Sequence, residues 1–193
     1  MHIISQRDNM GEDIENISFR ELLGYSIKGE EVAHEAYMEI SEKLSGLASD
    51  RFQTLAREEL DHKEELLKRY EEKFGTREYK VPDSDDLPPH ESSFDFSNAK
   101  NVIDSLEKGI KNEENARVIY EYMADRFSNY SSFFRYLALM EKGHYESLTE
   151  ELALMQGEIK EKGDREDKEG VRNFWASLTS YEDSAFGDRE HMR

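Results

Sequence analysis

Six side chains of types that bind metal ions stand where the predicted helices of this sequence would otherwise bury apolar residues. Glu30 and Glu113 fill one such place in the first and third helical segments. The second and fourth segments each carry a Glu-x-x-His motif, whose two side chains lie one turn apart on the same helix face. The six residues are Glu30, Glu59, His62, Glu113, Glu141 and His144. We therefore predict that four carboxylates and two imidazoles converge on one metal centre near the middle of the helices.

The two halves of the chain repeat this arrangement. Tyr37 follows Glu30 by seven residues, and Tyr120 follows Glu113 by the same number. The Glu-x-x-His motif begins 29 residues after Glu30 and 28 residues after Glu113. Such an internal repeat predicts a pseudo-two-fold arrangement, in which equivalent ligands approach one point from opposite sides.

Charge balance favours a metal centre over a purely structural role. Buried glutamate and histidine are often held by lysine or arginine, but the matching helix positions hold neither, apart from Arg117 at an edge. Unpaired buried charges are strongly destabilising, and like charges close together add to that cost. Two divalent cations would balance the four glutamates. Carboxylate-rich ligation with one imidazole per metal suits two iron ions, with manganese as an alternative, better than a structural zinc site; zinc remains an alternative occupant of the purified protein.

Hydrophobic periodicity predicts four helices of about 25–30 residues to position these side chains. The first begins near Ser18, which has capping-box spacing with Glu21, and its apolar residues continue to Leu47. A break at 46–50 separates it from the second helix. The predicted apolar patterns of the remaining helices run over residues 52–74, 102–127 and 133–155, the last fading before Gly163.

The connections between the helices predict the topology. Helices one and two, and helices three and four, are joined by breaks that are long enough only to reverse the chain. Between the pairs, residues 76–97 contain all three prolines and can run along the bundle. Two hairpins joined by one long crossover make an all-α, ferritin-like four-helix bundle. We predict this domain over residues 1–162, and over residues 163–193 an appendage with a short C-terminal helix that packs on the bundle or on a partner subunit.

The composition excludes several other classes of protein. A formal net charge of −18 argues against binding to nucleic acid or to an anionic membrane surface. The sequence has no apolar run of about 18 residues and no signal-peptide pattern at its N-terminus. It also has no cysteine, which excludes disulfides and thiolate metal sites. We expect one cytoplasmic domain that binds neither nucleic acid nor membrane.

The segments around the six residues resemble the rubrerythrin-like branch of the ferritin-like superfamily. They read IKGE at 27–30, ELDH at 59–62, IKNE at 110–113 and EKGH at 141–144, and the resemblance covers about residues 18–160. It implies a di-iron centre whose ferrous pair reacts with hydrogen peroxide or dioxygen. The glutamates would be terminal and bridging ligands, and the sequence leaves open which of them bridge.

Two departures from the family pattern change this expectation. Rubrerythrins proper carry a C-terminal rubredoxin domain, which needs cysteine, so the resemblance implies that electrons come from a separate rubredoxin-like protein or flavoprotein. They also have an extra glutamate three residues after the ligand of the third helix, where this chain has Ala116. Their peroxide-linked metal movement is therefore in doubt here. Bundles of this kind commonly self-associate, so we expect a homodimer.

Other residues near the motifs have less specific roles. Tyr37 and Tyr120 are either hydrogen-bond donors or radical traps near the site, or structural aromatic residues with satisfied hydroxyls. His34, one turn after Glu30, is interpreted as a core or edge histidine rather than as an extra ligand. Three further histidines fall in terminal or linker segments, where we expect them to face solvent: His2, His90 and His191.

These features together predict a di-iron oxidoreductase that reduces hydrogen peroxide or dioxygen while it oxidises a ferrous pair. The first alternative is an iron-handling ferroxidase with little peroxidase turnover. The second is a metal-stabilised bundle that acts by protein interaction through its terminal segment. Peroxide consumption with a supplied reductant separates the enzyme from the ferroxidase, which would instead accumulate iron in a large assembly.

Overall fold

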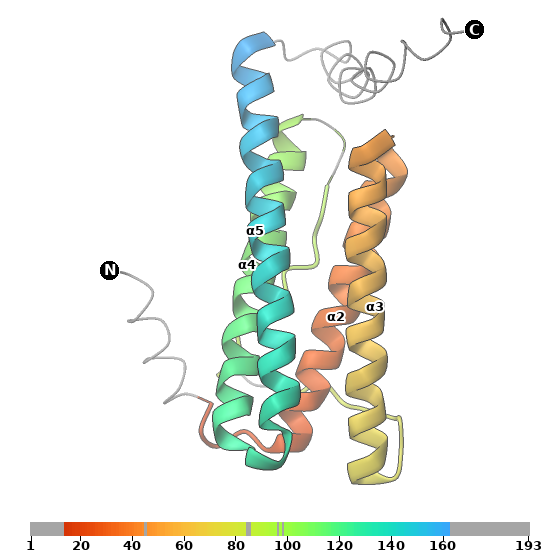
Figure 1. The fold of residues 1–193 in the computed structure, drawn as a ribbon, viewed down its shortest axis with the longest axis vertical. Coiled ribbons are helices and arrows are strands. Elements are labelled where there is room, and N and C mark those ends of the chain that lie inside the picture. The colour runs from red at the N-terminus through yellow and green to blue at the C-terminus, as the bar shows by residue number, and fades with distance from the viewer. Residues whose placement is uncertain (1–13, 45, 84–85, 96, 98, 163–193) are drawn as a thin grey trace, which may run out of the picture.

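A computed structural model describes residues 14–162 apart from 45, 84, 85, 96 and 98, and within this part of the chain all regular structure is helical (Figure 1). The predicted all-α bundle is confirmed. The long helices are α2 (Phe19–Lys43), α3 (Gly46–Phe74), α4 (Ala99–Arg126) and α5 (Ser131–Lys162), with a short 3₁₀ helix η1 (Ser128–Tyr130) before α5. The appendage predicted over 163–193 lies outside the described residues. None of the described helices has a stretch apolar and long enough to cross a bilayer.

The helices form two hairpins, as the lengths of the connections predict. Figure 1 shows α2 beside α3 and α4 beside α5, and the two hairpins approach each other most closely through α2 and α4. Since α3 ends and α4 begins at opposite ends of the bundle, the segment between them runs along its length. This is the long crossover of the ferritin-like topology.

The start of α2 follows the prediction, but the turn after it does not. Ser18 caps the helix: its hydroxyl accepts a hydrogen bond from the Glu21 backbone N–H at 3.2 Å, and the Glu21 carboxylate accepts one from the Ser18 N–H at 2.9 Å. The predicted break at 46–50 is wrong, because α3 already begins at Gly46. The backbone of Gly46 has a φ of 61°, which lets the chain reverse within about three residues. Leu47 therefore belongs to α3, and it is 62% exposed.

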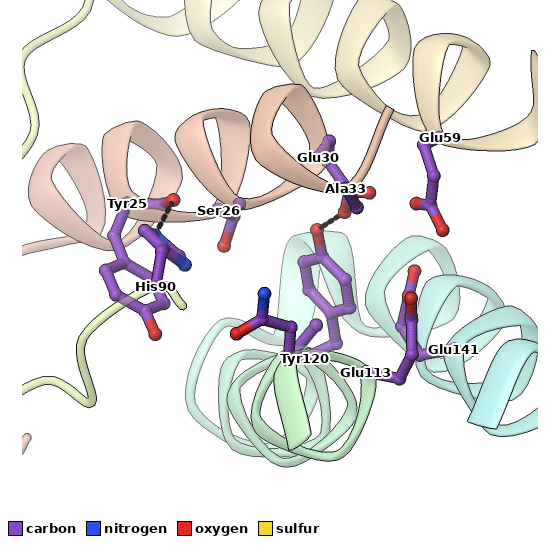
Figure 2. Close-up of a pocket in the computed structure, with 12 residues that line it drawn as sticks. Tyr25, Ser26, Glu30, Ala33, Glu59, His90, Glu113, Tyr120 and Glu141 are labelled. Carbon is purple, nitrogen blue, oxygen red and sulfur yellow. Dashed lines mark hydrogen bonds between the residues drawn. The ribbon is translucent and has the colours of Figure 1, made fainter. Parts of the chain in front are cut away.

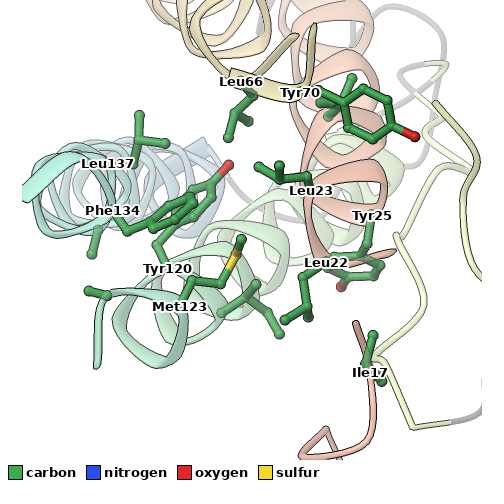
Figure 3. Close-up of a cluster of buried hydrophobic side chains, with 14 of the residues drawn as sticks. Ile17, Leu22, Leu23, Tyr25, Leu66, Tyr70, Tyr120, Met123, Phe134 and Leu137 are labelled. Carbon is green, nitrogen blue, oxygen red and sulfur yellow. The ribbon is translucent and has the colours of Figure 1, made fainter. Parts of the chain in front are cut away.

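Two separate apolar clusters fill the bundle, one on each side of a polar layer. The first apolar cluster is shown in Figure 3 and is rich in aromatic side chains. Its members from the four helices include Leu22, Leu23, Ile27, Leu66, Tyr70, Tyr120, Met123, Phe134 and Leu137. The second apolar cluster includes Ala33, Tyr37, Ile40, Phe52, Leu55, Ala56, Val102, Leu106, Leu148 and Met155. Each helix crosses from one cluster to the other near its middle, where the residues of the predicted centre lie.

The crossover packs tightly against α2. A Cβ on Gly24 would lie only 2.1 Å from the Lys80 carbonyl oxygen, so this approach of the two backbones requires glycine. Further along, the Tyr25 hydroxyl donates a hydrogen bond to the Pro88 carbonyl at 2.8 Å. The crossover is thus held against the helix that carries the first predicted ligand.

Candidate metal centre

The six residues predicted from the sequence lie together between the two apolar clusters. Glu30 comes from α2, Glu113 from α4, and each Glu-x-x-His motif from α3 or α5. All six side chains are buried, and none of the six residues is more than 5% exposed: Glu30, Glu59, His62, Glu113, Glu141 and His144. The polar positions that interrupt the four apolar helix faces therefore meet at one place.

Distances divide the six residues into two outer pairs and two shared carboxylates. Glu59 lies 2.8 Å from Nδ1 of His144 and 3.5 Å from Nδ1 of His62. Glu141 likewise approaches both rings, at 3.2 Å for His62 and 3.6 Å for His144. Glu30 approaches His62 and Glu113 approaches His144, each at 3.7 Å. Glu59 and Glu141 therefore occupy the middle of the cluster, with one Glu and one His outside them on each side.

The donor atoms of this cluster fit a metal ion. Ligand atoms of Glu59, His62, Glu141 and His144 all lie within 4.8 Å of one another, a spacing at which they could hold a cation. Buried polar atoms are nearly always hydrogen-bonded. In the described part of the chain, both oxygens of Glu59, Oε1 of Glu141 and Nδ1 of each histidine are buried and make no hydrogen bond. Metal coordination would satisfy these five atoms, and the mixture of carboxylate oxygen and imidazole nitrogen suits iron or manganese.

The two repeated tyrosines connect the halves of the bundle at this layer. The Tyr37 hydroxyl on α2 donates a hydrogen bond to the Glu113 carboxylate on α4. Reciprocally, the Tyr120 hydroxyl on α4 donates to the Glu30 carboxylate on α2 (Figure 2). Both rings are also buried in the apolar clusters, so each tyrosine is a structural aromatic residue whose hydroxyl is a hydrogen-bond donor next to the cluster. Each tyrosine fixes the outer carboxylate of the other half.

The protons of the cluster are distributed unevenly between inner and outer carboxylates. Burial, followed by the charges of neighbouring glutamates, raises the pKa of Glu30 and that of Glu113 well above their ordinary value. Burial would also raise the pKa of Glu59, but its contacts with His144 and His62 hold it below the ordinary value. Burial and the charge of Glu59 would raise the pKa of Glu141, but the contacts of Glu141 with His144 and His62 lower it.

The same contacts with carboxylates raise the pKa values of the two histidines. Burial would lower the pKa of His62, but the carboxylates of Glu141, Glu30 and Glu59 raise it to about 12. The pKa of His144 is likewise raised by Glu113, Glu141 and Glu59 despite burial. Without a metal, these shifts favour protonated histidines and protonated outer carboxyls, with the two inner carboxylates as their counter-charges.

Glu58 is a residue of the centre that the sequence argument missed. Nε2–H of His144 donates a hydrogen bond to the Glu58 carboxylate at 3.1 Å, which orients Nδ1 toward the cluster. Carboxylates in this position fix the ring and increase its strength as a ligand. The repeat gives no signal for Glu58, because the two motifs are 82 residues apart and the equivalent position is Met140. The two histidines are therefore supported differently.

We predict that Glu58→Ala weakens metal binding on the His144 side by about 10–100-fold, because the imidazole loses its orienting carboxylate. Titration of the metal-free protein with Mn²⁺, which is redox-silent in air-free buffer, measures the affinity of the His144 side and that of the His62 side. Glu65→Ala is the matched control, since it removes an exposed carboxylate from the same helix. Equal loss of affinity at both positions, or none, would contradict an oriented His144.

Two other residues singled out from the sequence lie outside the cluster. His34 lies 2.6 Å through Nδ1 from the Ala56 carbonyl oxygen, to which a ring N–H can donate, as expected of a core or edge histidine. Arg117 pairs with Glu114 and Glu121 on its own helix, at 2.7 and 2.6 Å. Arg117 therefore contributes no counter-charge to the four glutamates of the centre.

The expectation that His90 faces solvent is wrong. The ring of His90 is half-buried and stacks on Tyr25, with 4.1 Å between ring centroids. Figure 2 shows it at one end of a small cavity whose other end is formed by glutamates of the centre. Linker composition suggested exposure, but the crossover is packed onto the bundle, and a sequence pattern carries no signal for such a long-range contact. The expectations for His2 and His191 concern residues outside the described part of the chain.

Fold and site together define the class: this is a ferritin-like four-helix bundle with a carboxylate-rich cluster that could bind metal. The chain belongs to the Rubrerythrin family, whose sequence model matches residues 21–152 and, in a second match, residues 104–184. The resemblance drawn from the four motifs is thereby confirmed. Family membership supports a di-iron carboxylate site as the kind of centre these residues form.

A solved structure from Pyrococcus furiosus has the same fold. The protein, described as "Hypothetical Protein Pfu-1136390-001", superposes with a TM-score of 0.68 and is 30% identical in sequence. The match covers 76% of this chain and 96% of that chain. A comparison with curated proteins gives no match.

Proposed function

We propose that this protein is a di-iron oxidoreductase that reduces hydrogen peroxide, or dioxygen, with electrons from a separate donor protein. The observation that carries the proposal is the buried cluster of four glutamates and two histidines in a chain of the Rubrerythrin family. Among the described residues, five of its donor atoms make no hydrogen bond and contact one another only at ion-pair distances. A purely structural cluster would be expected to satisfy them.

In this proposal Glu59 and Glu141 would each contribute to the binding of both metal ions. Glu59 and Glu141 each approach both histidines, whereas Glu30 and Glu113 each approach one. The outer residues would then be terminal ligands, Glu30 with His62 and Glu113 with His144. Bound in this way, an iron pair would supply two electrons to the oxidant. The chain's own residues hold the ligands in place: the two tyrosines fix the outer carboxylates, and Glu58 orients His144.

Reduction of hydrogen peroxide to two water molecules takes two electrons and two protons. Electrons must reach the buried centre from outside, and the 193 residues contain no cysteine to hold a rubredoxin iron. We therefore propose a rubredoxin-like protein or a flavoprotein as the donor. A homodimer and a cytoplasmic location are parts of the same proposal.

The test is oxidation of the ferrous protein under controlled oxidants. Protein loaded with two equivalents of Fe²⁺ without air should be oxidised by one equivalent of hydrogen peroxide at least about tenfold faster than Fe²⁺ in buffer. Rapid mixing, read by the ferric absorbance, measures the rate, and repeated additions with a reductant measure turnover. Protein loaded with Zn²⁺, which has no redox chemistry, is the control. Rates no faster than buffer would contradict the proposal, and oxygen-driven iron accumulation in a large assembly would instead identify an iron-handling protein.

A further inference from the structure

A small cavity lies against the glutamate side of the candidate centre. Its inner wall includes all four glutamates of the cluster and Tyr120, whereas neither His62 nor His144 lines it. The cavity leaves a volume of about 20 Å³ for the centres of water-sized molecules, which is room for roughly one such molecule. A molecule in this cavity would therefore contact the carboxylate face of the centre, and only a very small molecule would fit.

His90 of the crossover lines the end of the cavity that lies away from Glu59, Glu113 and Glu141 (Figure 2). The ring stacks on Tyr25 at a centroid distance of 4.1 Å, and its Nε2 lies 3.0 Å from the Tyr25 carbonyl oxygen. The ring also packs against the next turn of the same helix, since a Cβ at Gly29 would be 3.0 Å from Cε1 of His90. Burial lowers the pKa of His90, so the neutral ring has one N–H, which it donates to the Tyr25 carbonyl. The ring is thus fixed in position rather than free in a linker.

The residue after His90 fastens the crossover to the opposite helix. The backbone N–H of Glu91 donates to Oδ1 of Asn112 on α4 at 3.0 Å, and Nδ2 of Asn112 donates back to the Glu91 carbonyl at 2.9 Å. The Glu91 carboxylate also pairs with Lys111 at 2.9 Å. The crossover therefore contacts α2 through His90 and α4 through Glu91, and it spans the two helices next to the cavity.

We propose that this cavity is the oxidant pocket of the centre and that His90 determines which hydroperoxides can enter it. The proposal rests on the function proposed above. Hydrogen peroxide is close to water in size and fits, whereas an alkyl hydroperoxide such as tert-butyl hydroperoxide is too large while the His90 ring is in place. His90 is accordingly a specificity-determining residue, and Ala116, a small residue in the cavity wall, keeps the space open.

Two variants of opposite effect test the pocket in the iron-loaded protein. His90→Ala should raise the rate of oxidation by tert-butyl hydroperoxide, relative to hydrogen peroxide, by at least about tenfold. Ala116→Val should fill the cavity and slow oxidation by hydrogen peroxide itself by about tenfold, with the metal content unchanged. His34→Ala is the matched control, because it removes a histidine that does not line the cavity. Wild-type protein that reacts equally well with both hydroperoxides would overturn the proposal.

A measurement without metal separates this inference from the proposed function. tert-Butanol has the bulk of tert-butyl hydroperoxide but no reactivity, and its binding to metal-free protein can be followed by NMR at the methyl groups of Ala33 and Ala116, which line the cavity. We expect saturable shifts in His90→Ala and none in the wild type. Equal shifts in both proteins would overturn the role of His90, even if the wild type oxidises iron with peroxide. Failure of the iron-loaded wild type to react with any oxidant would overturn the proposed function, whereas the tert-butanol result would still decide what His90 admits.

Discussion

Glu59→Ala will lose essentially all metal binding, whereas Glu30→Ala will lose only one of the two ions. Glu59 approaches the donor nitrogens of both histidines, at 2.8 Å for His144 and 3.5 Å for His62, so its removal takes a ligand from both positions. Glu30 approaches only His62, at 3.7 Å, and leaves the His144 side with its own glutamate. Elemental analysis after air-free loading with Fe²⁺ should fall from about two ions per chain to about one for Glu30→Ala and to near zero for Glu59→Ala.

The same experiment has a close control in Glu114→Ala, which removes a half-buried ion pair with Arg117 next to Glu113 and should leave occupancy unchanged. Because truncation at a buried position can disturb the fold, Glu59→Gln preserves the volume and removes only the charge. Circular dichroism establishes whether each variant is folded before metal is counted. Full occupancy in folded Glu59→Gln would show that the shared carboxylate is not a ligand.

The metal-free protein will lose stability as the pH rises from about 6 to 9. The pKa of His62 is raised from 6.5 to about 12 in the folded state, so its contribution is complete below about pH 6.5 and is lost as the pH rises toward 12. His144 is shifted in the same direction. Glu30 and Glu113 have pKa values raised above 4.5, so folding takes up their protons as well, which becomes less favourable at higher pH. All four groups therefore make folding less favourable as the pH rises.

Each proton taken up on folding reduces the free energy of unfolding by about 1.4 kcal/mol per pH unit, which lowers the melting temperature of a chain this long by roughly 3–6 °C. Thermal unfolding in chelator should therefore show a falling melting temperature between pH 6 and 9. With Mn²⁺ bound the four protons are already displaced, so the decline should be absent and the difference between the two forms should widen. Parallel pH profiles with and without metal would show that the cluster does not hold these protons.

The buried cluster of glutamates and histidines was predictable because it interrupts the apolar helix pattern in both halves of the chain. Burying a glutamate on an apolar helix face costs free energy. Glu30 and Glu113 nevertheless occupy such positions at equivalent places in the two repeated halves, and so do the two Glu-x-x-His motifs. Helix periodicity then fixes which side chains face inward, so burial of all six followed from the sequence. The topology followed from the contrast between two short connections and one long one.

The features that were missed depend on contacts between distant segments. Nothing in the composition of the crossover distinguishes His90 from a solvated linker residue, because its burial comes from packing against α2. Glu58 looks like any surface glutamate, and only the side-chain geometry brings it to His144. The position of the turn at Gly46 was also missed, since one residue with a positive φ replaces the longer break that the polar residues suggested.

The placement of the polar layer has a consequence for how the chain can be divided. Each apolar cluster is built from one end of all four helices, so neither cluster belongs to a single hairpin. The repeated unit of the sequence runs along the bundle, whereas the units of hydrophobic packing are stacked across it. An isolated hairpin would carry half of each core and one Glu-x-x-His motif, and it could bury its apolar face only by pairing with another hairpin. The part of the sequence that repeats is therefore not a part that can fold alone.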